Sequence, residues 1–380
     1  AYKYNFTDNR ERREWLTFNA SNEWIYPCDV AEVWLESPFS HEDSSKLCDR
    51  CRNIDLNATL SSLHEPKDGC DLCQLLLKPL EEARNKEPKT PLLEARQYVR
   101  ICAVPKPQDD SRRSNSIQPG LPGFLQDSEL HFKLIKEWIR LCDEGKCSQD
   151  RRPCPKPDRA RMPTRVIDVG DGYPMLFLRD KDKISQGAHY VALSHCWGKP
   201  PGKQEETTKE QKEPSKELGK NWNWSTTTSN KEKRAQGFLI TELPQTFQDA
   251  IEVTRKLGQR YLWIDSLCII QGENGDWETE AKKMEAVFKN AYYTIAATSA
   301  EDSNKGFLNR ALEKKDSQYV TVPNSSHGKV YVCTSIDDFH SDVEEGERAL
   351  SRRMIHFTKR QTYWECGGGV RFETLTYMKK

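Results

Sequence analysis

The sequence predicts an α/β protein in which a parallel sheet is flanked by helices. Between residues 190 and 300, short and nearly continuous apolar runs alternate with amphipathic helical segments, the pattern of strands that are covered on both faces of a parallel sheet. Two closely spaced cysteine pairs upstream predict an amino-terminal, cysteine-rich helical region stabilised by zinc. Short strand-like runs after residue 318 predict a β-rich extension at the carboxyl end.

Length and composition limit the classes of protein to consider. The chain has 380 residues, enough for two domains, which we place at residues 1–160 and 161–380. Lys plus Arg and Asp plus Glu both number 58, so the net charge gives no indication of a nucleic-acid partner. Charged residues make up 31%, yet 10 Trp, 13 Tyr and 13 Phe indicate folded blocks that are separated by solvated segments.

The same sequence gives expectations about location. No stretch approaches the roughly 18 apolar residues that a membrane span needs, and the first residues do not resemble a signal peptide. Thirteen cysteines along a long chain favour a reducing compartment over a disulfide framework. We therefore expect a cytoplasmic protein without a membrane span.

The amino-terminal region is predicted to contain two helices. The first covers residues 70–86, and the second covers 128–147, where apolar residues recur at helical spacing. Between them, residues 105–126 are rich in proline, serine and charged residues, which predicts a loop. Cysteines 142, 147 and 154 lie at the end of the second helix and after it.

The core is predicted as strands that alternate with helices. Residues 164–170 and 173–180 form a strand pair, and residues 199–237 form a polar, mobile insertion. Buried strands at 190–197, 261–270 and 292–300 are joined through helices at 245–258 and 276–291, and a β-hairpin follows at 318–335. Right-handed crossovers then place the carboxyl ends of the three buried strands at one edge of the sheet.

The strongest local signal for chemistry is the pair of cysteine motifs. Cys48 and Cys51 are separated by 18 residues from Cys70 and Cys73, a spacing that lets four thiolates surround a structural Zn²⁺ ion. His64 lies between the pairs and could replace one cysteine. The alternative is a group of partly buried, reduced thiols. Cysteines 142, 147 and 154 lack clean pairing, and a second metal site there stays an open question.

Polar residues follow each of the three buried strands. In an open parallel sheet, ligands bind outside the carboxyl ends of the strands, so these residues are expected to line a ligand crevice. They are Ser194, His195, Cys196, Trp197 and Gly198 after the first strand, Asp265, Ser266 and Cys268 at the second, and Thr298 and Ser299 after the third. Neighbours on a strand point to opposite faces, so a nucleophile and base pair built from Ser194, His195 and Cys196 is not expected.

Two carboxylates are candidates for catalysis, each with a simpler alternative. A buried Asp265 needs a hydrogen-bond donor, which a ligand or a strand-end group could supply, and it would equally suit a loop cap. Glu280 shares a helical face with Trp277 and Met284, and partial desolvation there would raise its pKa and suit proton transfer or ribose binding. An acid near a helix start also fits stabilisation of the helix dipole. The sequence contains no glycine-rich phosphate loop of the Rossmann or Walker type.

Several blocks in one order resemble the fungal heterokaryon incompatibility (HET) domain family. They are YVALSHCWG, LPQTFQDAIEVTRKLGQRYLWIDSLCIIQ, DWETEAKKM, VFKNAYYTIAATSA, GFLNR and LSRRMIHFTKRQTYWEC, between about residues 165 and 373. The upstream CDRC and CDLC pairs resemble the amino-terminal part often found in these proteins. The resemblance implies a role in non-self recognition and programmed cell death, and a TIR/flavodoxin-like core, because the family is distantly similar to the Toll/interleukin-receptor fold.

Some TIR domains cleave NAD at the nicotinamide-ribose bond with one glutamate, so the resemblance implies NAD as a substrate. Carried over to this sequence, the catalytic candidates are Glu280 and Asp265. The substrate-binding candidates are Ser194, His195, Trp197, Gly198, Ser266, Cys268, Gln271, Trp277 and Arg310.

Two departures from the family pattern bear on this hypothesis. Glu280 precedes the third buried strand, whereas TIR hydrolases place their glutamate after it. The family's Arg-Gly-Trp-x-x-Gln-Glu turn is reduced to Glu347 before the segment LSRR. The alternatives are therefore a small-molecule enzyme of secondary metabolism that uses the same strand-end crevice, and a non-catalytic scaffold that assembles with itself or with a partner incompatibility protein.

Overall fold

The structure is a computed structural model, and it describes 45–55, 66–77, 100–103, 118–119, 128–147, 154–158, 161–170, 174–198, 222–310, 319–324, 328–333, 339, 343, 350–374 and 377–378. Several expectations fall outside these residues. They are the role of His64, the helix beyond residue 77, most of the loop at 105–126, residues 199–221 of the insertion, and the turn at 344–348.

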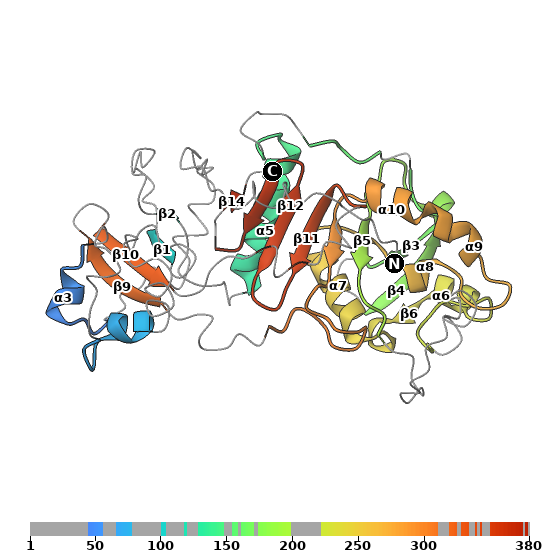
Figure 1. Cartoon of the computed structure of the whole chain (residues 1–380). Coiled ribbons are helices and arrows are strands. Elements are labelled where there is room, and N and C mark those ends of the chain that lie inside the picture. The colour runs from blue at the N-terminus through green and yellow to red at the C-terminus, as the bar shows by residue number, and fades with distance from the viewer. Residues whose placement is uncertain are drawn as a thin grey trace, which may run out of the picture. The chain divides into compact units, whose positions relative to one another are not determined.

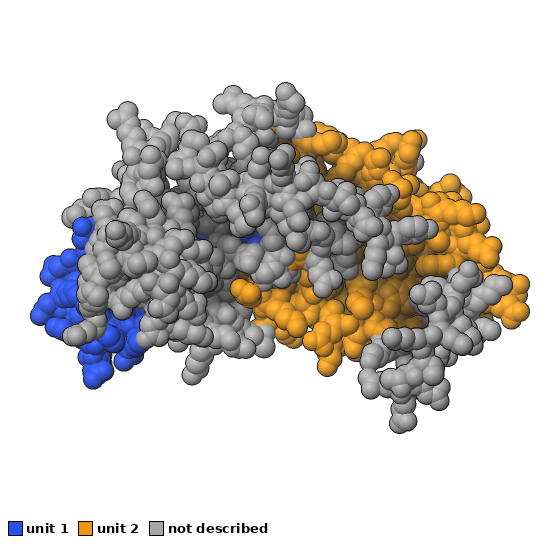
Figure 2. All heavy atoms as spheres, in the orientation of Figure 1, with its two compact units in different colours: residues 1–137, 312–339, 371–378 blue, residues 138–311, 340–370, 379–380 orange. Residues whose placement is uncertain are grey.

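The chain forms two compact units, and each is discontinuous in sequence (Figure 2). Unit 1 comprises residues 1–137, 312–339 and 371–378, and unit 2 comprises residues 138–311, 340–370 and 379–380. Each unit therefore draws on both sides of residue 160, where the sequence predicted the boundary between domains. No helix in the described part of the chain combines the length and apolarity that crossing a membrane requires.

Unit 1 contains a four-stranded sheet in the order β2-β1-β10-β9. Its strands are β1 (Arg100–Ala103), β2 (Gln118–Pro119), β9 (Tyr319–Asn324) and β10 (Gly328–Cys333). The predicted hairpin at 318–335 is confirmed as the antiparallel pair β9 and β10. Its partner could not be predicted, because β10 pairs with β1 from the amino-terminal region.

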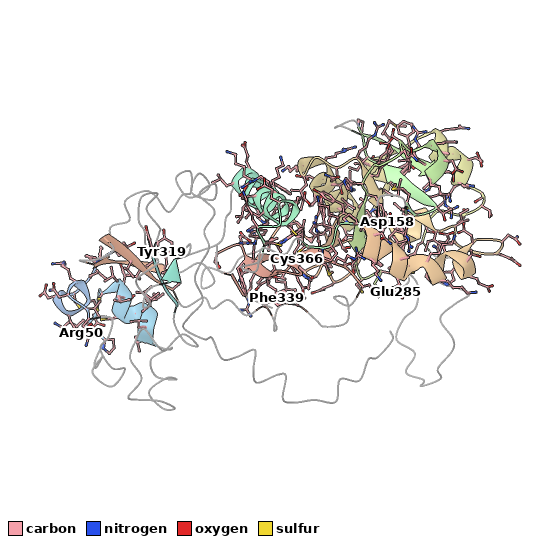
Figure 3. The ribbon with its side chains drawn as sticks, turned by 90° about the horizontal axis from the view of Figure 1, so that it is seen from above. Arg50, Asp158, Glu285, Tyr319, Phe339 and Cys366 are labelled. Atoms are coloured by element: carbon pink, nitrogen blue, oxygen red, sulfur yellow. The ribbon has the colours of Figure 1, made fainter. Side chains whose placement is uncertain are left out.

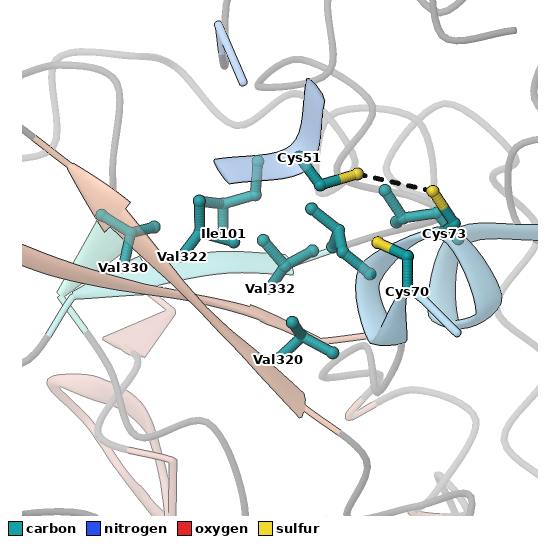
Figure 4. Close-up of a cluster of buried hydrophobic side chains, with 10 residues drawn as sticks. Cys51, Cys70, Cys73, Ile101, Val320, Val322, Val330 and Val332 are labelled. Carbon is teal, nitrogen blue, oxygen red and sulfur yellow. Dashed lines mark hydrogen bonds between the residues drawn. The ribbon is translucent and has the colours of Figure 1, made fainter. Parts of the chain in front are cut away.

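A short helix, α3 (Asp49–Arg52), and a helical segment at 71–77 carry the cysteine pairs of this unit. The cysteines pack into one apolar cluster with the sheet (Figure 4). The buried members of the cluster are Cys51, Cys70, Leu72, Cys73, Leu76, Ile101, Val320, Val322, Val330 and Val332.

The second sheet has ten strands in the order β14-β13-β12-β11-β8-β5-β7-β3-β4-β6 (Figure 1). The strands are β3 (Arg165–Asp168), β4 (Met175–Asp180), β5 (Val191–Ser194), β6 (Phe238–Leu239), β7 (Tyr261–Trp263), β8 (Thr294–Ala296), β11 (Arg353–Phe357), β12 (Thr362–Cys366), β13 (Gly369–Phe372) and β14 (Tyr377–Met378).

The centre of this sheet is parallel, as predicted. Strand β5 pairs in parallel with β7 and with β8, and β8 pairs in parallel with β11. On either side the pairing is antiparallel, through β3 and β4 at one flank and through β11 and β12 at the other. The prediction of a parallel sheet is therefore corrected to a mixed sheet, because short connections such as that between β3 and β4 can only return the chain in the opposite direction.

Four of the six helices described in unit 2 lie in segments that were predicted as helices, and the helices flank its strands in Figure 1. They are α5 (Ser128–Asp143, which begins in unit 1), α6 (Lys231–Gln236), α7 (Gln245–Lys256), α8 (Asp265–Cys268), α9 (Trp277–Glu280) and α10 (Met284–Asn290). Single 3₁₀ turns also occur at Lys181–Lys183, Ile240–Glu242 and Ala281–Lys283. Helix α7 ends before Gly258, whose φ of 74° suits a glycine stop.

Two expectations about this unit are wrong. The apolar run at 261–270 was predicted as one strand, but β7 ends at Trp263 and Asp265 begins the single turn α8. Short apolar runs fit a buried strand and a buried helix equally well. The segment at 199–237 was predicted to be polar and mobile throughout, but Trp222, Trp224 and Thr226 are buried and α6 follows them.

Candidate functional site

A tryptophan and an aspartate from two adjacent parallel strands meet at the carboxyl edge of the sheet. The indole Nε1 of Trp197, three residues after β5, donates a hydrogen bond of 2.9 Å to Oδ2 of Asp265. The other carboxylate oxygen, Oδ1, accepts the backbone N–H of Ser266 at 2.6 Å. Since β5 and β7 are parallel neighbours, the fold itself brings these two residues together. The structure thus joins two of the predicted site residues.

His195 lies in an aromatic environment at the same edge. Its ring stacks near Trp197, with centroids 6.4 Å apart, and meets the ring of Phe247 edge-on at 4.9 Å. Burial lowers the pKa of His195, and the nearby charge of Asp265 opposes this only in part. The imidazole is therefore neutral at pH 7, which leaves one ring nitrogen as a donor and the other as an acceptor.

Five of the buried polar atoms without a hydrogen-bond partner in the described part of the chain belong to residues at this edge. Such atoms cost free energy unless a ligand or water satisfies them. They are Nε2 of His195, Oγ of Ser266, Oγ1 of Thr298, Oγ of Ser299 and Oγ1 of Thr226. His195 follows β5, Ser266 follows β7, and Thr298 and Ser299 follow β8. These groups belong to the edge where the sequence predicted a ligand site.

Ser194 and Gly198, which lie at either end of the segment that carries His195 and Trp197, contribute through their backbone. Ser194 ends β5, and its carbonyl accepts the N–H of Ala297, which holds the ends of β5 and β8 together at 3.0 Å. Gly198 has a φ of 83°, and a Cβ at this position would lie 2.5 Å from Cβ of Asp302. Only glycine fits both the backbone conformation and the contact.

The loop before α6 packs against the strand ends. The ring of Trp224 meets Trp197 at 5.9 Å and Phe247 at 4.9 Å, both edge-on. The backbone N–H of Thr226 donates to the carbonyl of Ser266, and the N–H of Gln271 donates to the carbonyl of Thr226. This loop was not predicted from the sequence, because its tryptophans lie in a strongly polar stretch. Their density, with Trp222 and Trp224 two residues apart, was the available signal.

Cys268 and Gln271, two further candidates from the sequence, are buried, and their contacts stabilise the local backbone. Burial raises the pKa of the Cys268 thiol to about 12, so this thiol is neutral at pH 7. The side-chain amide of Gln271 donates to the carbonyl of Ile269 at 3.0 Å, and its backbone forms a bridge with Thr227. Both residues shape the turn that carries Asp265.

Glu280 has a different set of partners from Asp265. Its Oε1 accepts hydrogen bonds from Oγ1 of Thr164 at 2.9 Å and from Nζ of Lys283 at 2.8 Å, and its side chain is 8% exposed. Thr164 immediately precedes β3, which runs antiparallel beside β7. Glu280 is therefore tied to the start of the neighbouring strand β3, and within the described residues its hydrogen bonds do not reach Trp197 or Asp265.

The remaining predicted residues are not brought to the pair by any described interaction. Trp277 is half-buried at the start of α9. Asp276, beside it, forms an ion pair with Arg165, whose Nε donates to the carbonyl of Cys268. Arg310 donates from Nη1 to the carbonyl of Arg360 at 3.2 Å.

The four cysteines of unit 1 converge as the spacing predicted. The sulfur atoms of Cys48, Cys51, Cys70 and Cys73 all lie within 4.8 Å of one another, with 3.5 Å between those of Cys51 and Cys73. Three of the four residues are buried. A Zn–S distance of about 2.3 Å corresponds to about 3.8 Å between sulfurs in a tetrahedron. The four thiols thus have the geometry to hold one metal ion.

Local donors favour ionised sulfur at Cys70 and Cys73, whereas burial raises the pKa of Cys51. The guanidinium Nη2 of Arg50 lies 3.3 Å from Sγ of Cys73, and the N–H of Cys48 donates to Sγ of Cys70 at 3.4 Å. Burial alone would raise the pKa of Cys73, but hydrogen bonds, including one from the backbone of Lys67, lower it below the usual value. These donors suit the negative charge that thiolates around Zn²⁺ retain. Since four protein ligands leave no open position, a metal here would be structural.

The fold and these sites define a two-unit α/β protein with a polar strand-end cluster and a cysteine tetrad that could hold a metal. Residues 190–362 match the family model described as Heterokaryon incompatibility protein (HET). This segment is therefore a HET domain, as the sequence blocks indicated. Comparisons with curated proteins and with solved structures give no match.

Proposed function

We propose that the protein acts in fungal non-self recognition that leads to programmed cell death, and that its HET domain cleaves NAD at the strand-end cluster. The family match supports the first part at the level of a heterokaryon-incompatibility-type protein. The observation that carries the second part is the hydrogen-bonded pair of Trp197 and Asp265, together with unpartnered buried polar atoms of residues at the same strand ends.

The cluster has the chemistry that recognises a nucleoside. The hydroxyls of Ser266, Thr298 and Ser299 can each donate to and accept from ribose hydroxyls. The rings of Trp197 and His195 provide flat apolar surfaces for a base or a nicotinamide ring. A ligand of this class satisfies the atoms that the protein leaves unpartnered, and that gain favours binding.

Asp265 is the carboxylate that we assign to the reaction. Its two oxygens are oriented by Trp197 Nε1 and by the N–H of Ser266. A fixed carboxylate stabilises the positive charge that develops on the ribose as the glycosidic bond breaks. Water then adds to C1′ of the ribose, neutral nicotinamide leaves with the bonding electron pair, and the products are ADP-ribose, nicotinamide and one proton.

Glu280 is the other carboxylate predicted as catalytic, and its contacts suggest a different role. Thr164 and Lys283 already occupy one of its oxygens. We assign it to positioning, because it links α9 to Thr164, the residue before β3, and β3 pairs with β7, the strand that precedes Asp265. The two assignments give different outcomes in the same assay.

The test is release of nicotinamide from NAD by the purified full chain, followed by chromatography. We expect Asp265→Asn to lower kcat at least about 100-fold, as expected for the loss of a charge that acts in the transition state. Glu280→Gln should lower kcat less than tenfold, and Glu278→Gln, an exposed acid on the same helix, should leave the rate unchanged.

Three outcomes would overturn parts of the proposal. No release of nicotinamide by the wild-type chain at high concentration, with no change in Tm on addition of NAD, would exclude NAD as the substrate. Loss of activity in Glu280→Gln with activity retained in Asp265→Asn would reverse the two assignments. Toxicity on expression in a fungal host that persists in Asp265→Asn would favour killing by assembly over killing by catalysis.

A further inference from the structure

Four buried cysteines also meet in unit 2, and three of them lacked clean pairing in the sequence. The sulfur atoms of Cys142, Cys147, Cys154 and Cys366 lie within 4.8 Å of one another. Their exposed fractions are 1%, 2%, 5% and 2%. Cys142 lies in the last turn of α5, Cys147 and Cys154 follow that helix, and Cys366, which is labelled in Figure 3, ends β12. Four sulfurs from three separate elements thus point to one place.

The turn after Cys366 is shaped to bring its sulfur close to the other three. The N–H of Gly368 donates to Sγ of Cys366 at 3.4 Å, a type of contact that stabilises thiolate charge. A Cβ on Gly368 would lie 2.4 Å from the carbonyl oxygen and 3.1 Å from Sγ of Cys147. The backbone of this turn therefore approaches Cys147 more closely than any other residue would allow.

A buried arginine lies beside the four sulfurs. Arg353 of β11 is directly opposite Cys366 of β12 in the antiparallel register, so both side chains lie on the same face. It is 2% exposed, and its Nη1 bonds Asp143 at 2.7 Å. Its Nε and Nη2 atoms have no partner within the described portion of the chain. A buried guanidinium with free N–H groups calls for negative charge next to it.

Two simpler interpretations account for these facts less well. Disulfides would need sulfurs about 2.05 Å apart, whereas Cys147 and Cys154 are 3.2 Å apart and all four cysteines are free. Neutral thiols would pack as small apolar groups, but they would place no negative charge beside Nε and Nη2 of Arg353, which the bond from Nη1 to Asp143 leaves unpartnered. Four thiolates around a divalent cation carry net negative charge, and they explain both the convergence and the arginine.

We propose that Cys142, Cys147, Cys154 and Cys366 bind a second structural Zn²⁺ ion. The four ligands lie outside residues 190–362, three before this range and one after it. The ion therefore joins the segment that enters the HET domain to the segment that leaves it. With four protein ligands the site has no open position, so its role is to stabilise unit 2, and it is independent of the proposed NAD cleavage.

The first test measures the zinc content of the full chain by inductively coupled plasma mass spectrometry. The protein is purified without chelator and under reducing conditions. We expect two zinc ions per chain. Cys366→Ser and Cys51→Ser should each lower the content to one ion. Cys268→Ser, which removes a buried thiol outside both tetrads, should retain two.

Two further measurements keep the test decisive if a serine variant misfolds. Cys154→His offers another good zinc ligand in a loop and should retain the second ion, whereas Cys154→Ser should lose it. In the wild-type chain, alkylation should spare the four cysteines together until zinc is removed, and then modify all four. A wild-type content of one ion that Cys51→Ser abolishes, or a native disulfide between Cys147 and Cys154, would overturn the proposal.

Discussion

The two units of the molecule differ in how much apolar core surrounds their cysteines. In unit 1, three of the ten buried members of the core cluster are the cysteines themselves. In unit 2, the core is formed by fully buried residues of the ten-stranded sheet and its helices, such as Phe247, Leu262, Ile295 and Trp364. Metal binding contributes directly to folding where the core is small. The same kind of tetrad should therefore decide whether unit 1 folds and only adjust how stable unit 2 is.

Removal of metal should give the largest difference in amide protection between the two units. Binding of a structural zinc ion contributes on the order of 10 kcal/mol in small domains, which exceeds what the cluster of unit 1 can supply without it. We expect a strong chelator to abolish amide protection in β9 and β10 and to leave α7 of unit 2 protected. Hydrogen exchange followed by mass spectrometry measures both regions in one sample.

The matched variants separate the two tetrads in the same experiment. Cys51→Ser should reproduce the loss in β9 and β10, and Cys366→Ser should raise exchange in β12 and at the end of α5 instead. Equal loss of protection in both units after Cys51→Ser would contradict the comparison, because it would mean that unit 2 depends on the metal of unit 1.

A pair of neighbouring glycines sharpens the comparison within unit 2. Gly368→Ala would place a Cβ 2.4 Å from a backbone oxygen of Cys147, whereas Gly367→Ala would place one 3.5 Å from Sγ of Cys154, an ordinary contact. We expect Gly368→Ala to lower the free energy of unfolding by about 1–3 kcal/mol, typical of overpacking. Gly367→Ala should lower it by less than about 0.5 kcal/mol. Urea unfolding followed by tryptophan fluorescence measures both, and equal effects would mean that the turn relaxes freely.

The contact between Trp197 and Asp265 should make a smaller contribution to unit 2. A hydrogen bond to a charged acceptor contributes about 1.5–3 kcal/mol, and partial exposure of both residues places the expected value near the lower limit. A double-mutant cycle of Trp197→Phe and Asp265→Asn should give a coupling energy of about 1–2 kcal/mol. A coupling energy near zero would show that the two side chains act independently, and the site would then lack its organising contact.

The sequence predicted those features that are encoded within short windows. The three parallel strands have continuous apolar runs of their own, although the run at 261–270 extends past β7, and the hairpin of β9 and β10 and helix α7 each have a local pattern. The tetrad of unit 1 was predictable because its cysteines come in two close pairs, each on one local turn.

Features that depend on pairing between distant segments were not predictable in this way. Cys366 joins its tetrad only because β12 and α5 meet in the folded unit, and nothing near it in the sequence indicates three partners. Strand β1 gains its place only when β10 arrives from the other end of the chain. The position of Asp265 on a helical turn, and the packing of Trp224 on Trp197, likewise result from tertiary contacts that override local composition.

Titration of His195 should give the smallest measurable effect, a pH dependence of the stability of unit 2. Burial lowers its pKa in the folded chain, while the unfolded chain has a value of about 6.5. The unfolded state therefore binds more protons between these two values, so stability is complete well above about pH 6.5 and falls as the pH decreases through that value toward the folded pKa.

One proton limits the size of this effect to less than about 1.4 kcal/mol per pH unit. His195→Phe removes the titration and keeps a ring beside Phe247 and Trp197, so the variant should lose less stability than the wild-type chain between pH 7.5 and 5.5. Other titrating groups are common to both chains and cancel in the difference. Identical pH profiles from urea unfolding would mean that the imidazole is as well solvated in the folded state as in the unfolded one, and the strand-end cluster would then be open to water.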